Sequence, residues 1–369
     1  MSFSPDDYRY MARALQLAQR GLYTTHPNPR VGCVIVKDGQ IVGEGWHERA
    51  GEPHAEVFAL KQAGALAQGA TAYVTLEPCN HYGRTPPCSV ALVEAQVGKV
   101  MAAMVDPNPQ VAGQGLKRLE HAGIKTAFGL MEAEARALNQ GFLSQMERGR
   151  PFVRAKLASS LDGRTAMASG ESVWITGEAA RQDVQYWRAQ AGAVLTGIGT
   201  VLYDNPALNV RLTSEQLGLT TPIRQPLRVI VDSQLRIPLN AQILTLDGAV
   251  LIYTLNSDDV AKRAALEQLG VRIRVLETPT IELPMVMQDL IKQGINEVHV
   301  EAGATLNGAL FAAQLVDELV LYLAPHLMGS MGRPLVELPL QHMSERVGLT
   351  IKDMRRVGQD LRLVATPKY

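Results

Sequence analysis

Cysteine is scarce in this sequence, which holds only 3 among its 369 residues. So few cysteines cannot form a disulfide framework, and we expect Cys33, Cys79 and Cys88 to be free thiols or metal ligands in a reducing compartment. Long apolar runs are missing too, because none approaches the roughly 18–20 residues that cross a bilayer. The chain starts acidic, whereas a signal peptide starts basic and then turns apolar. We therefore expect a soluble, cytoplasmic protein without a membrane partner.

Net charge is absent as well, since 36 lysines and arginines balance 36 aspartates and glutamates. A protein that binds nucleic-acid backbones needs a basic face, so the balance argues against nucleic acid as a partner. It does not exclude one anionic small molecule held by a few arginines. Hydrophobic residues make up 46% of the chain and charged residues 20%, which is a globular composition. A globular chain of 369 residues suits two domains.

Helical and strand patterns alternate along the first part of the chain, which predicts a sheet with helices on its faces. Ser4 to Asp7 form a capping box that begins the first helix, and Asp38-Gly39 predicts a tight turn between two strands. The charged segment 147–151 breaks the pattern, so we predict one domain over 1–147 and a second over 150–369. The second domain alternates as well, but strands predominate. The main predicted elements are helices at 54–67, 88–96, 115–122 and 132–146, and strands at 72–76, 100–105, 124–127, 152–157, 193–196, 228–231, 250–253, 271–275, 297–301 and 318–324.

One histidine and two cysteines stand in a pattern typical of a metal site. His54 opens a predicted helix, Cys79 follows a predicted strand, and Cys88 begins the next helix. One imidazole and two thiolates are donors that Zn²⁺ accepts, and three protein ligands leave a fourth position for water. Bound water becomes a nucleophile near neutral pH, and Glu56 could carry its proton to a departing amine. This His-x-Glu…Pro-Cys…Cys pattern is that of zinc-dependent deaminases.

A structural zinc site, or a pair of buried thiols, is the alternative interpretation of the same residues. A structural site normally takes four protein ligands, and no fourth stands at a fixed spacing, although His81 is close. A carboxylate beside the first ligand also has no structural purpose. Eight residues separate Cys79 from Cys88, where the commoner form has two, so this loop must fold back to the metal. We favour a catalytic metal, and we expect Cys33 to be a buried core residue.

Three segments of the first domain carry a resemblance to a known family. Residues 25–32 read Thr-His-Pro-Asn-Pro-Arg-Val-Gly, residues 51–56 read Gly-Glu-Pro-His-Ala-Glu, and residues 77–88 run from Glu-Pro-Cys-Asn-His to Arg-Thr-Pro-Pro-Cys. They closely resemble the bifunctional deaminase–reductase of riboflavin biosynthesis, in which a serine usually stands at the position of Asn80. The resemblance implies a three-layer α/β cytidine-deaminase fold that removes an amino group from 2,5-diamino-6-(5-phosphoribosylamino)pyrimidin-4-one. It further implies the zinc ligands His54, Cys79 and Cys88, the proton shuttle Glu56, and the substrate contacts Asn28, His47 and His81.

The second domain gives weaker signals when it is considered alone. Residues 300–308 run from an apolar strand through small residues into a helix, and such a turn can hold a phosphate on its N–H groups. Gly197 to Thr200 could form a second such turn. An ordinary strand-to-helix turn explains either segment equally well. The full glycine fingerprint of a Rossmann site and its acidic partner are missing.

The family resemblance extends to the second domain at residues 156–164, 200–211 and 301–308. It implies an α/β domain similar to dihydrofolate reductase, which uses NADPH to reduce the ribosyl chain to ribityl and gives 5-amino-6-(5-phosphoribitylamino)uracil. The preference for NADPH over NADH rests on the resemblance alone. The implied cofactor-lining residues are Ala158, Trp174, Thr200, Asp204, Ser233, Gly303, Ala304, Thr305, Leu306, Asn307 and Gly308. The implied substrate contacts are Ser172, Arg188, Leu208, Arg211 and Glu301.

Four of these side chains have a chemistry that suits the implied reaction. Arg188 and Arg211 could bind the substrate phosphate, because guanidinium pairs with phosphate oxygens. Lys156 could polarise the sugar oxygen and Asp204 could supply a proton, so we take both as candidate catalytic residues. In the alternative interpretation, Lys156 is a surface charge and Asp204 caps a turn formed with the residues that follow it.

Three other functions stay open on the sequence alone. A nucleic-acid deaminase with an unrelated tail would use the same zinc pattern, but the zero charge balance and the lack of a basic, aromatic stripe argue against it. A zinc-stabilised scaffold would only bind nucleotides, and a working deaminase could be joined to an inactive reductase. We expect a bifunctional enzyme that acts on phosphorylated pyrimidines with Zn²⁺ and NADPH, and that forms a homodimer or homotetramer.

Overall fold

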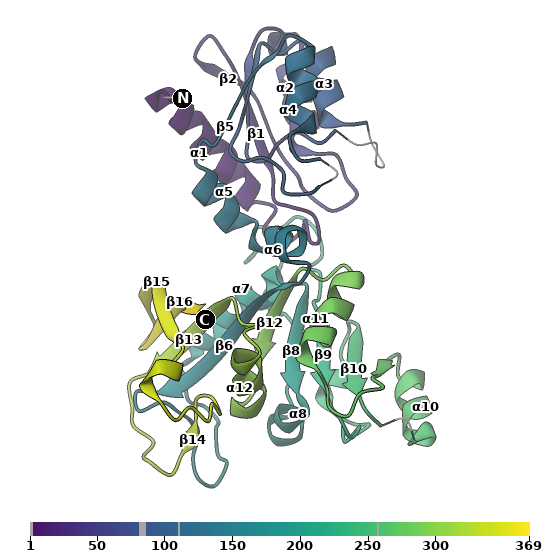
Figure 1. Ribbon diagram of the computed structural model, residues 1–369, viewed down its shortest axis with the longest axis vertical. Helices are drawn as coiled ribbons and strands as arrows, with labels where there is room; N and C mark the ends of the chain where they lie inside the picture. Colours follow the sequence, from purple (N-terminus) through teal and green to yellow (C-terminus); the bar gives the residue numbers. More distant parts are fainter. Residues whose placement is uncertain (1–2, 81–85, 110, 257) are drawn as a thin grey trace. The chain divides into compact units, whose positions relative to one another are not determined.

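The chain divides into two compact units, Met1–Gly149 and Arg150–Tyr369. The computed structural model describes residues 3–80, 86–109, 111–256 and 258–369, and the predicted substrate contact His81 lies outside them. The division falls inside the charged segment 147–151. Each unit has its own main sheet, of five strands in the first and nine in the second (Figure 1). Among the described parts of the chain, none of the helices has the length and apolar character needed to cross a bilayer.

The first unit is a three-layer α/β domain. Its sheet has the order β2-β1-β3-β4-β5, in which β1 is antiparallel to both neighbours and the last three strands are parallel. Helices α1 and α5 pack on one face, and α2, α3 and α4 cover the other (Figure 1). The elements are α1 (Pro5–Gln19), β1 (Gly32–Lys37), β2 (Gln40–Trp46), α2 (Ala55–Ala63), β3 (Thr71–Val74), α3 (Cys88–Glu94), β4 (Lys99–Ala102), α4 (Gln114–His121), β5 (Lys125–Phe128), α5 (Glu132–Leu138) and α6 (Gln140–Arg148).

The helix starts predicted in the first unit are present in the structure, and one predicted helix is divided in two. The Ser4 side chain accepts the Asp7 N–H while Asp7 accepts the Ser4 N–H, which completes the predicted capping box. The single helix predicted over 132–146 is wrong, because the chain forms α5 and α6 with Asn139 between them. The Asn139 side chain accepts the N–H of Arg30 at 2.7 Å and donates to its carbonyl at 3.0 Å. This contact with a distant segment breaks the helix, and periodicity alone does not reveal it.

Two glycines let helices approach the segments that carry the predicted ligands. A Cβ on Gly45 of β2 would lie 2.3 Å from the carbonyl oxygen of Ala55, so α2 packs directly on this strand. A Cβ on Gly115 of α4 would lie 2.0 Å from the carbonyl oxygen of Pro78. No other residue fits at such approaches. These contacts set the positions of the α2 N-terminus and of the loop after β3.

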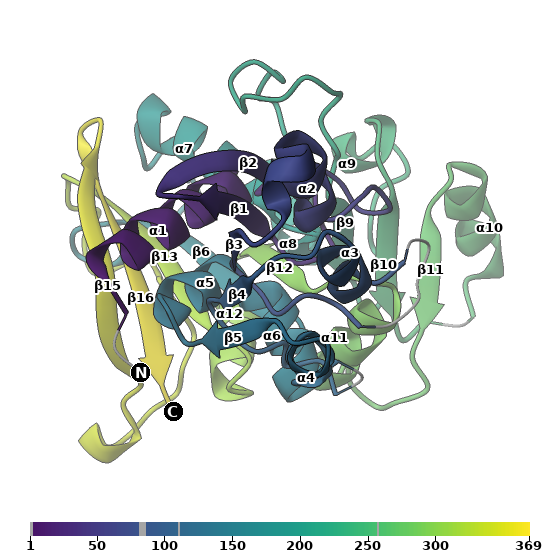
Figure 2. The ribbon, with the colours of Figure 1, turned by 90° about the horizontal axis from the view of Figure 1, so that it is seen from above.

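The second unit is built on a mixed sheet of order β11-β10-β9-β8-β12-β6-β13-β16-β15. In this order, the neighbouring strands from β11 through β13 are all parallel to one another. Strands β16 and β15 add antiparallel pairs at the edge opposite β11 (Figure 2). The elements are β6 (Phe152–Ser160), β7 (Arg164–Ala166), α7 (Glu178–Gln190), β8 (Ala193–Gly197), α8 (Ile198–Asp204), β9 (Leu227–Val231), α9 (Gln242–Thr245), β10 (Val250–Thr254), α10 (Val260–Gln268), β11 (Arg272–Val275), α11 (Leu283–Lys292), β12 (Glu297–Glu301), α12 (Ala304–Ala312), β13 (Glu318–Ala324), β14 (Arg333–Pro334), β15 (Gly348–Val357) and β16 (Asp360–Lys368).

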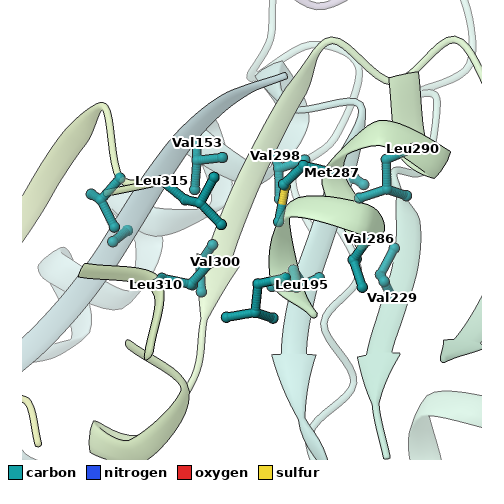
Figure 3. Close-up of a cluster of buried hydrophobic side chains, with 14 of the residues drawn as sticks. Val153, Leu195, Val229, Val286, Met287, Leu290, Val298, Val300, Leu310 and Leu315 are labelled. Carbon is teal, nitrogen blue, oxygen red and sulfur yellow. The ribbon is translucent and has the colours of Figure 1, made fainter. Parts of the chain in front are cut away.

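The two faces of this larger sheet are covered differently. Helices α11 and α12 pack on one face, over apolar side chains from β6, β8, β9 and β12 such as Val153, Leu195, Val229 and Val298 (Figure 3). The other face carries α7 over β13 and β16, and a second cluster over β8, β9 and β10. All seven strands predicted for this unit are present, but the β15–β16 hairpin is not among them. Its strand β15 lies at the sheet edge and is largely exposed, so its pattern lacks a buried run.

Candidate functional site

The predicted metal ligands meet at the ends of three elements of the first unit. His54 is the N-cap of α2, Cys88 is the first residue of α3, and Cys79 lies in the loop after β3. The His54 Nδ1 is 3.3 Å from the Cys88 Sγ and 3.5 Å from the Cys79 Sγ. The three donor atoms all lie within 4.8 Å of one another. One imidazole nitrogen and two sulfurs at this spacing fit Zn²⁺, and a site with three protein ligands takes a water as its fourth.

Electrostatics at this cluster favour a thiolate. Hydrogen bonding from Cys88 and His54 outweighs burial and lowers the pKa of Cys79 to about 4. The backbone N–H of Cys88, at the start of α3, also points at the Cys79 sulfur at 3.3 Å. A metal needs the deprotonated sulfur, so this environment suits a ligand. Cys33 differs, because full burial raises the pKa of its thiol well above the ordinary value, as expected for a core residue.

Glu56 follows the cluster in the first turn of α2 and is only 3% exposed. Burial raises the pKa of its carboxyl, and the side chain contacts Cys88. A carboxyl whose pKa is raised toward neutrality can both accept and release a proton during one reaction. Glu56 therefore stands where a proton carrier beside the metal would have to stand.

Two further predicted residues of this site, Asn28 and His47, contact each other. The His47 Nδ1 lies 3.1 Å from the Pro53 carbonyl oxygen, and its Nε2 lies 3.1 Å from the Asn28 amide nitrogen. A carbonyl only accepts, so Nδ1 carries the proton and Nε2 accepts from Asn28 in the neutral ring. Burial lowers the pKa of His47, which keeps the ring neutral. The His47 ring meets His54 edge-on with centroids 5.4 Å apart, so this pair borders the cluster.

Sequence reasoning missed a role for Glu77. Its buried carboxylate accepts four backbone N–H groups: Oε2 from Asp106 at 3.1 Å and Gly113 at 2.9 Å, and Oε1 from Gly115 at 2.9 Å and Leu116 at 3.2 Å. It thereby ties the segment that leads to Cys79 to the N-terminus of α4. The sequence signal was a carboxylate two residues before a ligand, but its partners come from a segment about 30 to 40 residues away.

In the second unit, Lys156, Arg188 and Glu301 meet above one face of the sheet. Glu301 ends β12 and receives Nε and Nη2 of Arg188 from α7, the latter at 2.9 Å. The Lys156 Nζ, on the adjacent strand β6, lies 4.0 Å from Glu301 Oε2. Burial lowers the pKa of Lys156, while the Glu301 charge raises it. Burial would raise the pKa of Glu301, but Arg188, His299 and Lys156 outweigh it and hold that pKa well below its usual range. The result is an ionised, largely buried cluster.

The remaining predicted substrate contacts lie on elements that border this cluster. Ser172 Oγ donates to the carboxylate of Asp204, the last residue of α8, at 3.3 Å. Leu208 is buried, whereas Arg211 is exposed and its backbone N–H donates to Gln185 of α7 at 3.0 Å. Partial burial and the positive charge of Arg188 lower the pKa of Arg211. Two guanidinium groups close enough to perturb each other are suited to an anion.

The predicted cofactor residues follow the carboxyl ends of the parallel strands. Gly303 is the N-cap of α12 after β12, and a Cβ there would meet nothing within 4 Å. Asn307 holds this turn, since its amide donates to the carbonyl oxygens of Ala302 at 2.7 Å and Gly303 at 3.2 Å. Its Oδ1 and the Thr196 Oγ1 at the end of β8 are buried without a hydrogen-bond partner among the described residues. Open glycine backbone and unsatisfied polar atoms at one sheet edge fit a dinucleotide cofactor.

Other predicted cofactor residues are spread over neighbouring segments of the second unit. Ala158 lies in β6, Thr200 in α8 and the exposed Ser233 just after β9. Trp174 is 70% exposed and packs against the Arg181 guanidinium, which is 4.5 Å from its ring centroid. Gly308 is buried within α12. The chain at Glu337 packs so closely on it that a Cβ would lie 2.1 Å from the Glu337 carbonyl oxygen. Gly308 therefore serves close packing, while Trp174 and Ser233 offer exposed surface.

A three-layer domain with a His–Cys–Cys cluster, followed by a mixed-sheet domain, defines the class of a zinc-dependent deaminase joined to a reductase. Family models divide the chain in the same way. The zinc-binding region of cytidine and deoxycytidylate deaminases matches residues 4–104, and the RibD C-terminal domain matches residues 151–363. The chain belongs to the RibD family of riboflavin biosynthesis proteins.

Similar proteins cover nearly the whole chain. The riboflavin biosynthesis protein RibD of Escherichia coli is 53% identical over 368 residues, which span 97% of this chain and 98% of that protein. RibD of Haemophilus influenzae is 51% identical and spans 100% and 99%. The structure of Acinetobacter baumannii RibD matches with a TM-score of 0.90 at 50% identity, covering 99% of both chains. A diaminohydroxyphosphoribosylaminopyrimidine deaminase/5-amino-6-(5-phosphoribosylamino)uracil reductase of Thermotoga maritima matches with a TM-score of 0.87 at 30% identity, covering 98% and 99%. The predicted family and fold class are confirmed.

Proposed function

We propose that this chain catalyses two successive reactions on one phosphorylated pyrimidine. Residues 1–147 would deaminate 2,5-diamino-6-(5-phosphoribosylamino)pyrimidin-4-one, and residues 150–369 would reduce the product with NADPH to 5-amino-6-(5-phosphoribitylamino)uracil. The observation that carries the proposal is the pairing of two chemically different sites in separate units. One is the His54–Cys79–Cys88 cluster beside buried Glu56. The other is the buried group of Lys156, Arg188 and Glu301. The activity named for the Thermotoga maritima relative supports the same pair of reactions.

In the deaminase, His54, Cys79 and Cys88 would hold the zinc ion. Zinc, when bound, acts as a Lewis acid that makes a water nucleophilic at neutral pH. Glu56 takes a proton from that water and returns it to the amino group, so that ammonia leaves and a carbonyl remains on the ring. Its raised pKa suits both transfers. Asn28 and the neutral His47 orient the pyrimidine beside the cluster, together with His81.

In the reductase, bound NADPH would be the source of the hydride that reduces the ribosyl carbon. The Lys156 ammonium polarises the sugar oxygen bonded to that carbon, and Asp204, held by Ser172, supplies a proton as the ring opens. Burial lowers the pKa of the Lys156 ammonium, and the opposite charge of Glu301 offsets part of that shift. Arg211 is the better phosphate ligand of the two predicted arginines, because Arg188 already donates to Glu301 and to the Asn209 carbonyl oxygen. Arg188 contributes its remaining donors and its charge.

The residues that would hold NADPH follow the carboxyl ends of β8, β9 and β12. The turn at Gly303, with Ala304, Thr305 and Leu306 in the first turn of α12, offers backbone N–H groups to a phosphate. Asn307 and Gly308 keep this turn in place from behind. Ala158, Thr200, Asp204, Ser233 and Trp174, which lies in the loop before α7, would be the other residues that contact the cofactor.

We also propose that the protein works in the cytoplasm as a homodimer or homotetramer. Thiolate ligands require reduced cysteines, which a reducing compartment maintains. Self-association is supported by β15, a strand at the sheet edge that exposes 60% of Ile351 and 64% of Met354. Light scattering of the purified chain measures the number of copies, and a monomer at micromolar concentration contradicts this part of the proposal.

Two assays on one sample test the proposed function. Ammonia release from the diaminopyrimidine measures the first reaction, and NADPH absorbance with the deaminated pyrimidine measures the second. Zinc is quantified in the same sample. A chain that releases ammonia from tRNA and not from the diaminopyrimidine would be a nucleic-acid deaminase. A chain that deaminates the pyrimidine but never consumes NADPH would contain an inactive reductase.

A further inference from the structure

The central strand β12 has an unusual composition for its position. A strand in the middle of a parallel sheet is covered on both faces and normally carries apolar side chains on both. Val298 and Val300 follow this rule and pack into the core shown in Figure 3. The alternate residues are Glu297, His299 and Glu301, of which His299 is 0% exposed. Three ionisable side chains are therefore placed on the opposite face of a buried strand.

Neighbouring elements contribute the matching charges on that face. Arg154 and Lys156 of β6 stand directly across from His299 and Glu301 in the strand register, and Arg188 comes from α7. Arg154 lies 4.0 Å from Glu297 and also pairs with Glu318 of β13. Burying ionised groups costs free energy unless they are paired and hydrogen-bonded. Such a costly arrangement at the edge of a reaction site points to a functional role.

His299 is a fully buried member of this group, and its ring lies beside Glu301. Its Nε2 lies 3.5 Å from Glu301 Oε1, at the outer limit of a hydrogen bond, and the ring nitrogens have no other hydrogen-bond partner within the described parts of the chain. The charged groups that face it are Arg154 on β6, Arg188 on α7, and Glu297 and Glu301 on β12, while Val194 lies across from it on β8. Burial and the two arginines keep the pKa of His299 low, so the ring is neutral and one nitrogen carries a proton.

We propose that His299 is a positioning residue of the reductase, which directs its Nε2–H at Glu301 Oε1 and so fixes the carboxylate that holds Lys156. This inference rests on the proposed reductase function. Arg188 donates from Nε to Glu301 Oε1 and from Nη2 to Oε2. The His299 Nε2 faces Oε1, the oxygen that already accepts from Arg188 Nε, from within the sheet. Glu301 Oε2 is then turned to Lys156 Nζ. Without His299, the carboxylate is held by Arg188 alone, and nothing within the sheet opposes a shift of Oε2 toward Arg188 and away from the lysine.

Two substitutions of matched size separate the donor from the shape of the ring. His299→Gln keeps an N–H group at the place of Nε2, and His299→Leu fills the space without a donor. The full chain is assayed for reductase kcat and KM with the deaminated pyrimidine, over a range of pH. Its deaminase activity serves as an internal control, because the substitution lies in the other unit. Its melting temperature reports whether the variant is folded.

The expected result is a reductase kcat lowered about tenfold or more in His299→Leu, with KM for NADPH unchanged. The alkaline limb of its pH profile moves to lower pH, since Lys156 loses the nearby opposite charge and gives up its proton more easily. His299→Gln stays within about threefold of the parent chain. Deaminase activity is unchanged in both variants.

The proposal is overturned if His299→Leu keeps the parent kcat and alkaline limb, or if His299→Gln is impaired as much as a folded His299→Leu. If the leucine variant does not fold, His299→Asn replaces it as the test. The asparagine side chain is shorter, so its amide lies near the position of the ring Nδ1 and does not reach Glu301. The proposal then predicts an impaired asparagine variant and an active glutamine variant, and equal activity contradicts it. Failure of the parent chain to oxidise NADPH would instead contradict the proposed function.

Discussion

The two sites of this chain are built in opposite ways. Residues of the deaminase site come from helix starts and strand ends, so that three short segments contain His54, Glu56, Cys79 and Cys88. The reductase site is assembled from the middle of β6, the end of β12, α7 and α8, and is held by buried ion pairs. A metal site concentrates its chemistry in a few ligands. A site that binds a dinucleotide and a sugar phosphate needs donors over a long surface, so its residues are dispersed in the sequence.

Metal removal separates the two sites most completely. Chelation of zinc should abolish deaminase activity, because the Lewis acid that activates water is lost. The reductase should keep its full rate, since the cluster lies in the first unit alone. Ammonia release and NADPH oxidation are measured before and after dialysis against a chelator, and after zinc is restored. Loss of both activities, with both units still folded, would contradict separate sites.

Glu56→Gln removes the proton carrier and leaves the ligands in place. We expect deaminase kcat to fall roughly 10²–10⁴-fold, the usual contribution of a general acid–base group. Zinc content measured by metal analysis should stay at one ion per chain, and the reductase should be unaffected. Glu94→Gln, on the exposed end of α3, is the matched control. Deamination by the Glu56→Gln chain at the parent rate would show that Glu56 does not transfer the proton.

Lys156→Ala and Asp204→Ala test the dispersed site. Each should lower reductase turnover by about 10²-fold or more, because oxygen polarisation and proton supply are lost. Deaminase activity should not change, and Lys292→Ala, an exposed lysine at the end of α11, should be silent in both assays. Retained reductase turnover in both variants, with unchanged folding, would rule out these roles.

Glu77→Gln tests how the compact site is supported, and its effect is the smallest. One oxygen becomes an NH₂ group that faces two backbone N–H donors of the segment 106–116. We expect the first domain to lose about 1–3 kcal/mol of unfolding free energy, the cost of leaving such donors unsatisfied. Denaturant unfolding followed by deaminase loss measures it, with reductase loss as the control. Equal destabilisation of both activities would contradict a local role.

The sequence was informative where chemistry and chain order coincide. The capping box at Ser4 and the hairpin at Asp38-Gly39 are local, and both are present. Each predicted strand of the second domain also exists, and several of them, such as β8, β9 and β10, are buried parallel strands that read as short apolar runs. The His-x-Glu and Pro-Cys segments bring donors together since helix starts and strand ends meet at one edge of a sheet.

Long-range partners could not be predicted. The break at Asn139 depends on Arg30, and the tether at Glu77 depends on residues 106–116. Arg188 and Glu301 were both expected to contact substrate, yet they bind each other across more than a hundred residues. Nothing in the local pattern reveals such a pair, because a buried arginine and a surface arginine look alike in sequence.

A coupled assay on the Glu56→Gln chain shows directly whether the two reactions are separate and successive. The parent chain, given the diaminopyrimidine and NADPH, should release one ammonia for each NADPH it oxidises. The Glu56→Gln chain should do neither with that substrate, and should oxidise NADPH at the parent rate when the deaminated pyrimidine is supplied instead. NADPH oxidation by this variant from the diaminopyrimidine without ammonia release, or failure with the deaminated pyrimidine, would contradict the account.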